Sequence, residues 1–483
     1  MNLSVVQRIV GLLLMIFSVT MLPPVIVSLI YRDGGSIAFL SGFGLTLSAG
    51  FITWAPVRRA RLDLRLRDGF LVVAGFWVVL GVFGALPLYL SPEPSISLTD
   101  AVFESISGLT TTGATVLTGL DALPHSVLFY RQQLQWLGGM GIIVLAVAIL
   151  PMLGVGGMQL YRAETPGPMK DSKMTPRVTE TAKALWYIYL GLTLLCGVSF
   201  WAAGMSVFDA IGHAFSTVAI GGFSTHDASI GHFNNVTIEM ITVVFMFASG
   251  INFSLHFVAW RDARIKDYFR DPEFRAYTFV LGMITLFLFV ELFRRGEYPS
   301  VLDAFTKSIF QAVSIGTTTG FATAGFAAWP AHLPMLLIMA SFIGGCAGST
   351  GGGMKVIRWL LIYKQGVREI IRLVHPSAQI PVKLGSKAVP NRVIEAVWGF
   401  FSVYTVLFSI MIVILMFIGL DTVTAFSAIA ASLNNLGPGL GDVASNFASV
   451  PDAGKWVSMG AMLLGRLEIF TLLVLFSGTF WRS

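Results

Sequence analysis

Ten long apolar runs constrain this chain more than any other feature of its sequence. Each is close to the roughly 20 residues that an α-helix needs to cross about 30 Å of hydrocarbon. The runs cover residues 9–31, 34–57, 69–92, 132–161, 184–208, 240–260, 276–293, 331–354, 396–420 and 457–480, and only the seventh looks short, with Glu291 near its end. Only 12% of the residues are charged, about half of the usual fraction in soluble proteins. We therefore predict an all-α integral membrane protein with ten spanning helices.

The first run follows a basic residue, Arg8, as in a secretory signal peptide. It is too long for one and no small-x-small cleavage site follows it, so we interpret it as a retained span. Cys196 and Cys346 both lie inside apolar runs. Two such cysteines supply neither a disulfide framework nor a metal cluster, and we expect small buried side chains.

Most of the 32 basic residues gather at the N-terminus, on alternate connections and at the C-terminus. The connection after the eighth run is the richest and includes Lys355, Arg358, Lys364, Arg368 and Arg372. The positive-inside rule makes this side cytoplasmic, with both termini on it. The net charge of +6 then reflects topology and contact with anionic membrane lipid, and it does not indicate a nucleic-acid partner.

Four connections on the other side are themselves apolar, too short to span, and end in glycine. They are residues 100–113, 209–222, 303–320 and 424–437. We expect a short helix in each, capped by Asp100, Asp209, Asp303 or Thr424. The third segment has four more residues, about one extra helical turn. Because a full span follows each segment, the order span, short helix, glycine segment, span occurs four times, which indicates internal repeats.

This organisation predicts one pseudo-fourfold pore. Residues 1–67 would hold two extra N-terminal spans, and residues 68–183, 184–274, 275–392 and 393–483 would form four membrane–pore-helix–membrane repeats. Non-helical backbone at membrane depth is tolerated only inside protein or against a watery cavity. Four such segments around one axis would form a ring.

A ring of this kind favours a cation, because the short helices point their C-terminal ends toward the membrane centre. Backbone carbonyls can replace the water of an ion, and glycine permits the positive φ angles that such a turn needs. Without Asp or Glu in the last three residues of any segment, a monovalent ion is favoured over a divalent one. The candidate ion-binding residues are Thr111, Thr112, Gly113, Ile220, Gly221, Gly222, Thr318, Thr319, Gly320, Asn435, Leu436 and Gly437.

Other polar residues near the ring have supporting roles in this interpretation. We expect Glu104, His213 and Gln311 to hydrogen-bond short helix to filter rather than to touch the ion. In the fourth segment either Gly437 or Gly439 could be the filter glycine. We choose Gly437 because it aligns the start of the fourth segment with the starts of the first two.

Several motifs together resemble the TrkH family of the Trk/Ktr/HKT potassium transporters. They are TTTGATV, IGGFSTHD, TTTGFAT, NNLGPGLG, IGGCAGSTGGGMK and the ending GRLEIF…FWRS. The resemblance covers the whole chain and implies a homodimer in the bacterial inner membrane, with potassium passing through a pore in each protomer. It also implies a cytosolic nucleotide-binding partner of the TrkA type. The second and fourth filters depart from the family pattern because they lack the Thr-rich sequence.

The eighth run contains many glycines, each of which costs a helix about 1 kcal/mol relative to alanine. We expect this span to be broken. The glycine run is either close packing of small residues or, as the resemblance implies, a gating loop beneath the filter. The gate candidates are Gly344, Gly345, Gly348, Gly351, Gly352, Gly353 and Arg466. Arg466 interrupts the tenth run and is expected at the pore, whereas Glu468 is expected to pack structurally.

No cytoplasmic segment is long enough to fold as a domain, and none carries a dinucleotide or phosphate-loop motif. We therefore predict that this chain has no nucleotide site and that a soluble oligomeric partner supplies one. Lys364, Arg368 and Arg372 are its candidate contacts because they follow directly from the glycine run. For each of them, the alternative is that the charge only follows the positive-inside rule.

Two other functions are weaker interpretations. A proton- or sodium-coupled secondary transporter would show intramembrane carboxylates and broken helices in paired halves, whereas this chain has a fourfold pattern. An intramembrane enzyme is not expected, because the sequence has no HExxH, GxSxG or Walker motif. The sequence leaves open whether the protein is a channel or a coupled carrier, how strongly it prefers potassium to sodium, and which nucleotide controls the partner.

Overall fold

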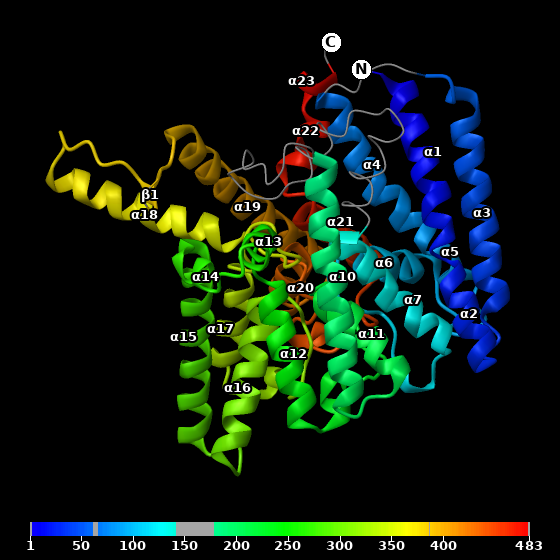
Figure 1. Ribbon diagram of the computed structural model, residues 1–483, viewed down its shortest axis with the longest axis horizontal. Helices are drawn as coiled ribbons and strands as arrows, with labels where there is room; N and C mark the ends of the chain where they lie inside the picture. The colour runs from blue at the N-terminus through cyan, green and yellow to red at the C-terminus, as the bar shows by residue number, and fades with distance from the viewer. Residues whose placement is uncertain (1, 61–65, 142–177, 386, 482–483) are drawn as a thin grey trace.

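The computed structural model describes residues 2–60, 66–141, 178–385 and 387–481. Within these residues the secondary structure is helical except for one antiparallel hairpin, in which β1 (Lys383–Leu384) pairs with β2 (Lys387–Ala388). The start of α1 (Leu3–Val19) and the short α23 (Gly478–Trp481) lie at the same end of the molecule (Figure 1). An even number of membrane crossings gives this arrangement, as the sequence predicts.

Two helical spans precede the first repeat. The first consists of α1 and α2 (Leu22–Tyr31), and the second of α3 (Ser36–Trp54) with the short turn η1 (Ala55–Val57). A Cβ atom at Gly11 or at Gly50 would meet the carbonyl oxygen of the other glycine. The backbones of α1 and α3 therefore approach closely through small residues, a common way for membrane helices to pack.

The first two repeats each place a short helix between longer segments. The first contains α4 (Leu66–Gly84), α5 (Leu86–Leu90), the short helix α6 (Leu98–Leu109), α7 (His125–Trp136) and η3 (Leu137–Gly141). The rest of the predicted fourth span, residues 142–161, lies outside the described residues, as do the basic residues between 162 and 177. The second repeat contains α10 (Val178–Ala202), the short helix α11 (Val207–Val218), α12 (Val236–Ser249) and α13 (Phe253–Arg261).

The last two repeats follow the same order. The second repeat ends with α14 (Lys266–Arg270), and the third contains α15 (Pro272–Arg295), the short helix α16 (Val301–Gly316), α17 (His332–Ser341) and α18 (Val356–Val374). The fourth contains α19 (Asn391–Ile418), the short helix α20 (Thr422–Leu433), α21 (Asp452–Arg466) and α22 (Phe470–Phe476). As predicted, α16 is one turn longer than the others, with 16 residues against 12.

The predicted spans are not all straight. The chain bends by 94° between α12 and α13 and by 115° between α21 and α22, and α17 has only 10 residues before the predicted break. The seventh span is not short, because α15 extends to 24 residues by including charged residues at both ends. Six described helices are long and apolar enough to cross a membrane, and the bent pairs raise this number to eight.

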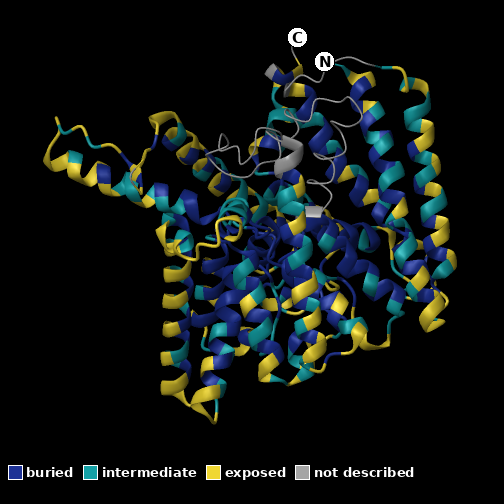
Figure 2. Ribbon diagram, viewed as in Figure 1, coloured by how far each residue is buried: buried dark blue, intermediate teal, exposed yellow. Residues whose placement is uncertain are grey.

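Burial separates the outside of the molecule from its centre. The side chains around the four short helices are buried, whereas α15 and α19 expose apolar residues along their length (Figure 2). Phe417 on α19, for example, is 92% exposed. Exposed apolar area of this extent suits contact with lipid. The polar residues buried at the centre, by contrast, need partners inside the protein.

Candidate functional site

The short helices begin with a cap that lies three residues before the one expected. Ser97, Ser206 and Ser300 each accept a hydrogen bond, at 3.0–3.1 Å, from the amide of the aspartate three residues later, and each donates its hydroxyl proton to that carboxylate. Asp421 accepts the corresponding bonds at the start of α20. The caps predicted at Asp100, Asp209, Asp303 and Thr424 are therefore wrong. These residues lie in the first helical turn, where the carboxylates of the three aspartates still interact favourably with the positive end of the helix dipole.

All four short helices end in the same hydrogen-bond pattern. In α6 the amide of Thr111 donates to the carbonyl oxygen of Gly108 at 3.0 Å, and the amide of Thr112 donates to that of Ser107 at 2.9 Å. The same two bonds end the other three short helices, with amides from Ile220 and Gly221, Thr318 and Thr319, and Asn435 and Leu436. This is a Schellman motif, which pairs the last helical carbonyls and turns the chain.

The second residue after each short helix adopts a left-handed conformation without being glycine. The φ angles are 55° at Thr111, 54° at Ile220, 70° at Thr318 and 53° at Asn435. Such a conformation costs an ordinary residue roughly 1–2 kcal/mol, and β-branched residues seldom adopt it. The sequence predicted positive φ only at the glycines. Strain at four equivalent positions is typical of a functional site.

The four glycines two positions later close a ring. We call residues 111–113, 220–222, 318–320 and 435–437 the ring segments; their glycines have φ angles of 78°, 79°, 86° and 98°. A Cβ atom at Gly113 would collide with the carbonyl oxygen of Gly221, one at Gly222 with that of Thr319, one at Gly320 with that of Leu436, and one at Gly437 with that of Thr112. Each repeat therefore contacts the next, and the fourth returns to the first.

The fourth segment fits the ring at Gly437. Its φ of 98° matches the other three glycines, whereas Gly439 is not among the glycines with positive φ and its amide donates to the carbonyl oxygen of Val443 at 2.9 Å.

In the second segment, the carbonyl oxygen of Gly221 accepts a hydrogen bond from Nε2 of Gln135 at 2.6 Å. That carbonyl, one of those predicted to face the ion, thus already has a protein donor.

Polar residues on the short helices bind the chain just after the ring, as predicted. Oε2 of Glu104 accepts from the amide of Val116 at 3.0 Å, Nε2 of His213 lies 2.9 Å from Oγ of Ser224, and Nε2 of Gln311 donates to the carbonyl oxygen of Ala324 at 3.3 Å. The fourth helix uses Ser427, which the sequence reasoning missed. Its hydroxyl accepts from the amide of Leu440 at 2.8 Å.

Arg131 was also missed, because its partners are distant in sequence. Its side chain is 1% exposed, and its Nε lies 2.6 Å from Oε1 of Glu104, which is fully buried. The guanidinium also donates to the carbonyl oxygen of Ser224 at 3.1 Å and lies over the ring of Phe223 at 4.2 Å. The buried ion pair lies within the first repeat, and the contacts of Arg131 with Ser224 and Phe223 join it to the second repeat.

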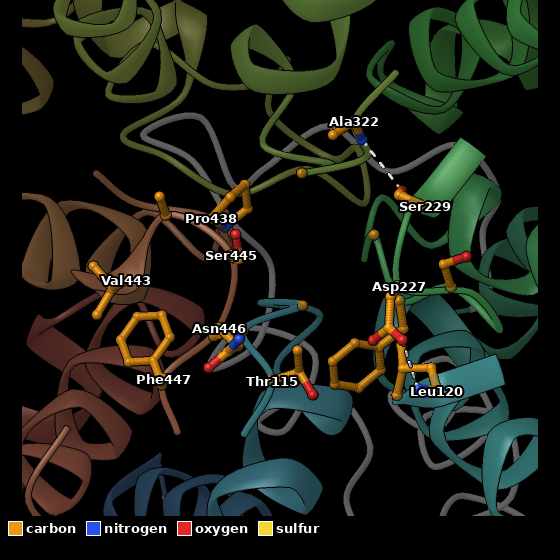
Figure 3. A pocket seen from close by; sticks show the side chains of 18 of the residues that line it. Thr115, Leu120, Asp227, Ser229, Ala322, Pro438, Val443, Ser445, Asn446 and Phe447 are labelled. Atoms are coloured by element: carbon orange, nitrogen blue, oxygen red, sulfur yellow. Dashed lines mark hydrogen bonds between the residues drawn. The ribbon is translucent and has the colours of Figure 1, made fainter. Parts of the chain in front are cut away.

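A cavity of about 210 Å³ lies against the ring and is lined by all four of its glycines. Figure 3 shows that the side chains around it come from all four repeats, with Thr115 and Leu120 from the first, Asp227 and Ser229 from the second, Ala322 from the third and Pro438, Val443, Ser445, Asn446 and Phe447 from the fourth. Hydrogen bonds join neighbouring repeats here. The amide of Leu120 donates to Asp227 at 3.0 Å, that of Ala322 to Ser229 at 3.2 Å, and that of Phe447 to the carbonyl oxygen of Thr115 at 2.7 Å.

The wall of the cavity also carries charge. His226 lines it and hydrogen-bonds through Nδ1 to Oδ1 of Asp121. This bond lowers the pKa of Asp121. Burial lowers the pKa of His226, but the carboxylates of Asp209 and Asp121 outweigh it and the net shift is upward.

The predicted break in the eighth span lies on the other side of the ring. Helix α17 ends at Ser341 and α18 begins at Val356, and the glycine-rich loop between them contacts the ends of three short helices. The hydroxyl of Thr350 donates to the carbonyl oxygen of Val218 at 2.9 Å, the amide of Gly352 donates to Oγ1 of Thr318 at 2.7 Å, and the amide of Gly353 donates to the carbonyl oxygen of Asn434 at 3.0 Å. The loop therefore covers the ring from this side.

The predicted gate glycines lie in this loop, some with positive φ angles and others in tight contact with neighbouring atoms. Gly344, Gly348 and Gly353 have φ between 68° and 72°. A Cβ atom at Gly352 would collide with the carbonyl oxygen of Asn434, and one at Gly345 or Gly351 would press on neighbouring loop or short-helix atoms. Glu273, which the sequence reasoning did not consider, anchors the loop by accepting from the amides of Ala347 at 2.7 Å and Ile357 at 3.1 Å.

Two cations lie at the loop. Arg466 donates to Oγ1 of Thr111 at 3.1 Å and to the carbonyl oxygens of Gly138 and Gly139 at 2.5 and 2.6 Å. Lys355, which the sequence reasoning counted as a cytoplasmic loop charge, is 6% exposed, and its Nζ donates to the carbonyl oxygen of Gly351. The break in the span turns this residue inward, with φ of 78°.

Arg358 is a second basic residue that does not face solvent. It is 6% exposed, and its guanidinium lies 2.8 Å from Oε2 of Glu468 and 4.1 Å from the ring centre of Phe400. Glu468 thus has the structural role expected of it, through an ion pair with Arg358 of α18. The bend between α21 and α22 places it there.

The predicted partner contacts lie along α18, which projects from the body together with the hairpin (Figure 1). Lys364 donates to the carbonyl oxygen of Lys383 at 2.7 Å, and Arg372 lies 3.3 Å from Oε1 of Glu369. Arg368 is only 9% exposed and donates to Oδ1 of Asn391 at 3.2 Å. Of the three, Lys364 and Arg372 keep accessible charge.

Four helix-flanked re-entrant segments, closed into a ring inside a bundle of apolar helices, define a membrane protein built from four internal repeats around one axis. The family model described as "Cation transport protein" and called TrkH matches residues 35–483. The chain belongs to the TrkH family.

Individual relatives agree with this assignment. The chain is 59% identical to "Trk system potassium uptake protein TrkH" of Vibrio parahaemolyticus and 58% identical to the protein of the same name from Halomonas elongata, each over the full length of both chains. It is 42% identical to "Trk system potassium uptake protein TrkG" of Escherichia coli, covering 100% of this chain and 99% of the relative. The solved structure titled "Crystal Structure of the Potassium Transporter TrkH from Vibrio parahaemolyticus" matches with a TM-score of 0.91 and 57% identity over the whole of both chains. These relatives are named as transport proteins, in agreement with the expectation that the chain is not an enzyme.

Proposed function

We propose that this chain takes up potassium across the bacterial inner membrane through the axis of the ring. The observation that carries the proposal is the closed contact of the four ring segments, in which each glycine lies against a carbonyl oxygen of the next repeat. The names of full-length relatives at 56–59% identity support potassium as the ion. The ion is the cargo, and no nucleotide site is proposed in this chain.

In this mechanism the backbone selects the ion. The left-handed residue and the glycine of each ring segment turn the chain so that carbonyl groups of residues 111–113, 220–222, 318–320 and 435–437 can replace the water of potassium. The four short helices add the negative ends of their dipoles below the ring. Because the ring segments contain no carboxylate, the site lacks the ligands that hold a divalent ion, and a monovalent ion can leave again.

The glycine-rich loop is the proposed gate. It covers the ring from one side through hydrogen bonds to residues at the ends of α11, α16 and α20, and Arg466 joins it to the end of α6. Lys355 and Arg466 add positive charge beneath the ring, which opposes the passage of a cation. Opening then requires the loop between α17 and α18 to leave the axis.

We place both termini, the loop between α17 and α18 and the projecting α18 on the cytoplasmic side. The cavity lined by the ring glycines then opens to the outside. The exposed basic residues before α15 and along α18 support this orientation through the positive-inside rule and through anionic lipid. We also propose that residues 68–183, 184–274, 275–392 and 393–483 are the four repeats, after two extra spans in residues 1–67.

The proposed partners are a second copy of this chain and a cytosolic nucleotide-binding protein of the TrkA type. Helix α18 supports both contacts, since it leaves the body and exposes Tyr363, Ile370, Leu373 and Val374 beside its charged residues. Apolar side chains on a cytoplasmic projection have no lipid to cover them, and protein surfaces fit them better. The accessible charges of Lys364 and Arg372 would then contact the TrkA-type partner.

Ion flux in liposomes tests the function. The purified chain should pass potassium faster than sodium, and replacing Gly113 with serine should reduce that preference. Single-channel currents in bilayers would identify a channel, whereas flux coupled to a proton or sodium gradient, without such currents, would favour the secondary transporter. Absence of potassium flux in liposomes that contain folded protein would overturn the proposal.

A further inference from the structure

Three side chains that can bind a metal converge at the outer wall of the cavity. Asp121 lies in η2 (Leu120–Ala122), His226 follows the second ring segment, and His232 lies in η5 (Ser229–Phe233). One ligand atom from each lies within 4.8 Å of the other two. Asp121 belongs to the first repeat and the two histidines belong to the second, so folding of the ring brings the three side chains together.

Their spacing is close to that of a coordination shell. Nδ1 of His226 hydrogen-bonds to Oδ1 of Asp121, and Nδ1 of His232 lies 3.9 Å from the same oxygen. The two imidazole rings are parallel, with centroids 3.5 Å apart. Ligand atoms around a tetrahedral metal ion lie about 3.3 Å apart when the bonds are about 2.0 Å. Binding would require the stacked imidazoles to rotate about their side-chain bonds, so that both Nδ1 lone pairs point at one ion.

A second carboxylate is placed behind His226. Nε2 of His226 is buried, makes no hydrogen bond within the described residues, and lies 3.5 Å from Oδ1 of Asp209. Thr225 and Ser206 hold Asp209 with hydrogen bonds of 2.8 and 2.7 Å. A metal-binding histidine typically directs its other ring nitrogen to a carboxylate, which fixes its tautomer and orientation. Binding through Nδ1 would give Nε2–H this acceptor.

We propose that Asp121, His226 and His232 bind a divalent transition-metal ion of the Zn²⁺ class, with water as the fourth ligand. Two imidazoles and one carboxylate suit Zn²⁺, Co²⁺ or Ni²⁺, whereas Mg²⁺ and Ca²⁺ prefer oxygen ligands alone. Three protein ligands and one open position are usual where an ion remains exchangeable.

A bound ion would hold the first two repeats together at the outer mouth. Next to the cluster, the amide of Leu120 already donates to Asp227 at 3.0 Å. Since His226 lines the cavity above the ring, a divalent ion there would also repel entering cations. This effect on flux rests on the proposed function, whereas metal binding does not.

Calorimetry on the full-length chain in lipid nanodiscs, with any affinity tag removed, tests the site. We expect about one Zn²⁺ bound per chain and no comparable binding of Mg²⁺. Asp121→Asn, His226→Gln and His232→Gln should each weaken Zn²⁺ binding about 10- to 100-fold. His332→Gln is the matched control, because His332 is an exposed histidine 3.6 Å from Glu291 and lies outside the cluster. Absence of Zn²⁺ binding, or equal binding by the three variants and the control, would overturn the site.

Flux measurements test the consequence separately. Zn²⁺ on the cavity side should slow potassium flux through the native chain and the His332→Gln control, and it should affect His232→Gln much less. Binding without any slowing would remove the effect on flux and leave both the metal site and the ion pathway standing. Failure of the native chain to pass potassium at all would instead overturn the proposed function.

Discussion

Arg466 and Thr350 lie in contact beneath the ring, with Nη1 of the arginine 3.2 Å from the carbonyl oxygen of the threonine. The arginine comes from the bend in the fourth repeat and the threonine from the loop in the third. The same nitrogen also donates to Thr111 at 3.1 Å. One guanidinium therefore joins the loop to the end of the first short helix. The loop contacts given above for the described residues reach the ends of the other three short helices.

Replacing Arg466 with glutamine should raise basal potassium flux about tenfold. Hydrogen bonds to a charged group contribute about 1.5–3 kcal/mol, and losing about 1.4 kcal/mol of closed-state stability raises the open population tenfold. Potassium flux into liposomes that contain the purified variant, without any cytosolic partner, measures this increase in basal flux. Arg261→Gln is the control, since that side chain is exposed and its contacts with Asp262 and the ring of Phe257 are local to its own helix end.

Deletion of residues 345–351 distinguishes a gate from simple packing. A gate predicts higher basal flux, whereas packing predicts lower thermal stability without higher flux. The second result, together with unchanged flux in the Arg466 variant, would exclude the loop as the gate.

Alanine at Gly113 or Gly320 should reduce the preference for potassium over sodium. The added Cβ would collide with the carbonyl oxygen of Gly221 or of Leu436, in a backbone conformation that already disfavours side chains. Flux ratios in liposomes report the loss. Gly282→Ala in α15 is the matched control, because nothing lies within 4 Å of its added Cβ. Equal flux ratios for folded ring variants and the control would remove those segments from the filter.

Glu104→Gln should lower the free energy of unfolding by about 3–5 kcal/mol, because it leaves the buried guanidinium of Arg131 without its counter-ion. The exposed pair of Glu291 and Arg295, 2.7 Å apart, offers a comparison. Glu291→Gln should cost less than about 1 kcal/mol. Unfolding of both variants in parallel SDS titrations measures the difference, and similar losses would contradict the structural role of the buried pair.

Charge reversal at Lys364 and Arg372 together should abolish co-purification of a TrkA-type partner and its control of flux, while ion selectivity stays intact. Arg368 is left unchanged here because it is buried against Asn391, and its reversal would disturb α18 itself. Arg294→Glu is the control, because Arg294 lies in the last turn of α15, at the end of that helix away from α18. Retained binding and nucleotide control in the double variant would reject this contact.

Local sequence patterns predicted the repeats but not the long-range contacts that the repeats make. Each repeat combines a short apolar helix, a glycine and a following span, and these signals predicted the helical architecture and the break before α18. The ion pair of Arg131 and Glu104 has partners 27 residues apart, and the cluster of Asp121 and His226 has partners 105 residues apart. No periodicity predicts such contacts.

Two errors have physical causes that recur in membrane proteins. In the Ser-x-x-Asp sequence at the start of three short helices, both residues can cap, and the serine does so because it precedes the first turn. Lys355 and Arg358 were counted among the charges of a cytoplasmic connection, and the positive-inside rule does not predict which of those charges a break in the helix buries. Left-handed Thr111 and Ile220 escaped prediction because β-branched residues disfavour that conformation, and only closure of the ring imposes it.

The glycine-rich loop has a consequence for how such a protein can be assembled. The third repeat supplies this loop, which contacts the ends of three short helices and is linked to the first by Arg466. Four identical subunits would each bring such a loop to a single axis that has room for one. Joining the repeats in one polypeptide lets the third carry the loop while the fourth contributes Arg466 instead. Covalent linkage thus allows a fourfold pathway to be closed by an asymmetric part.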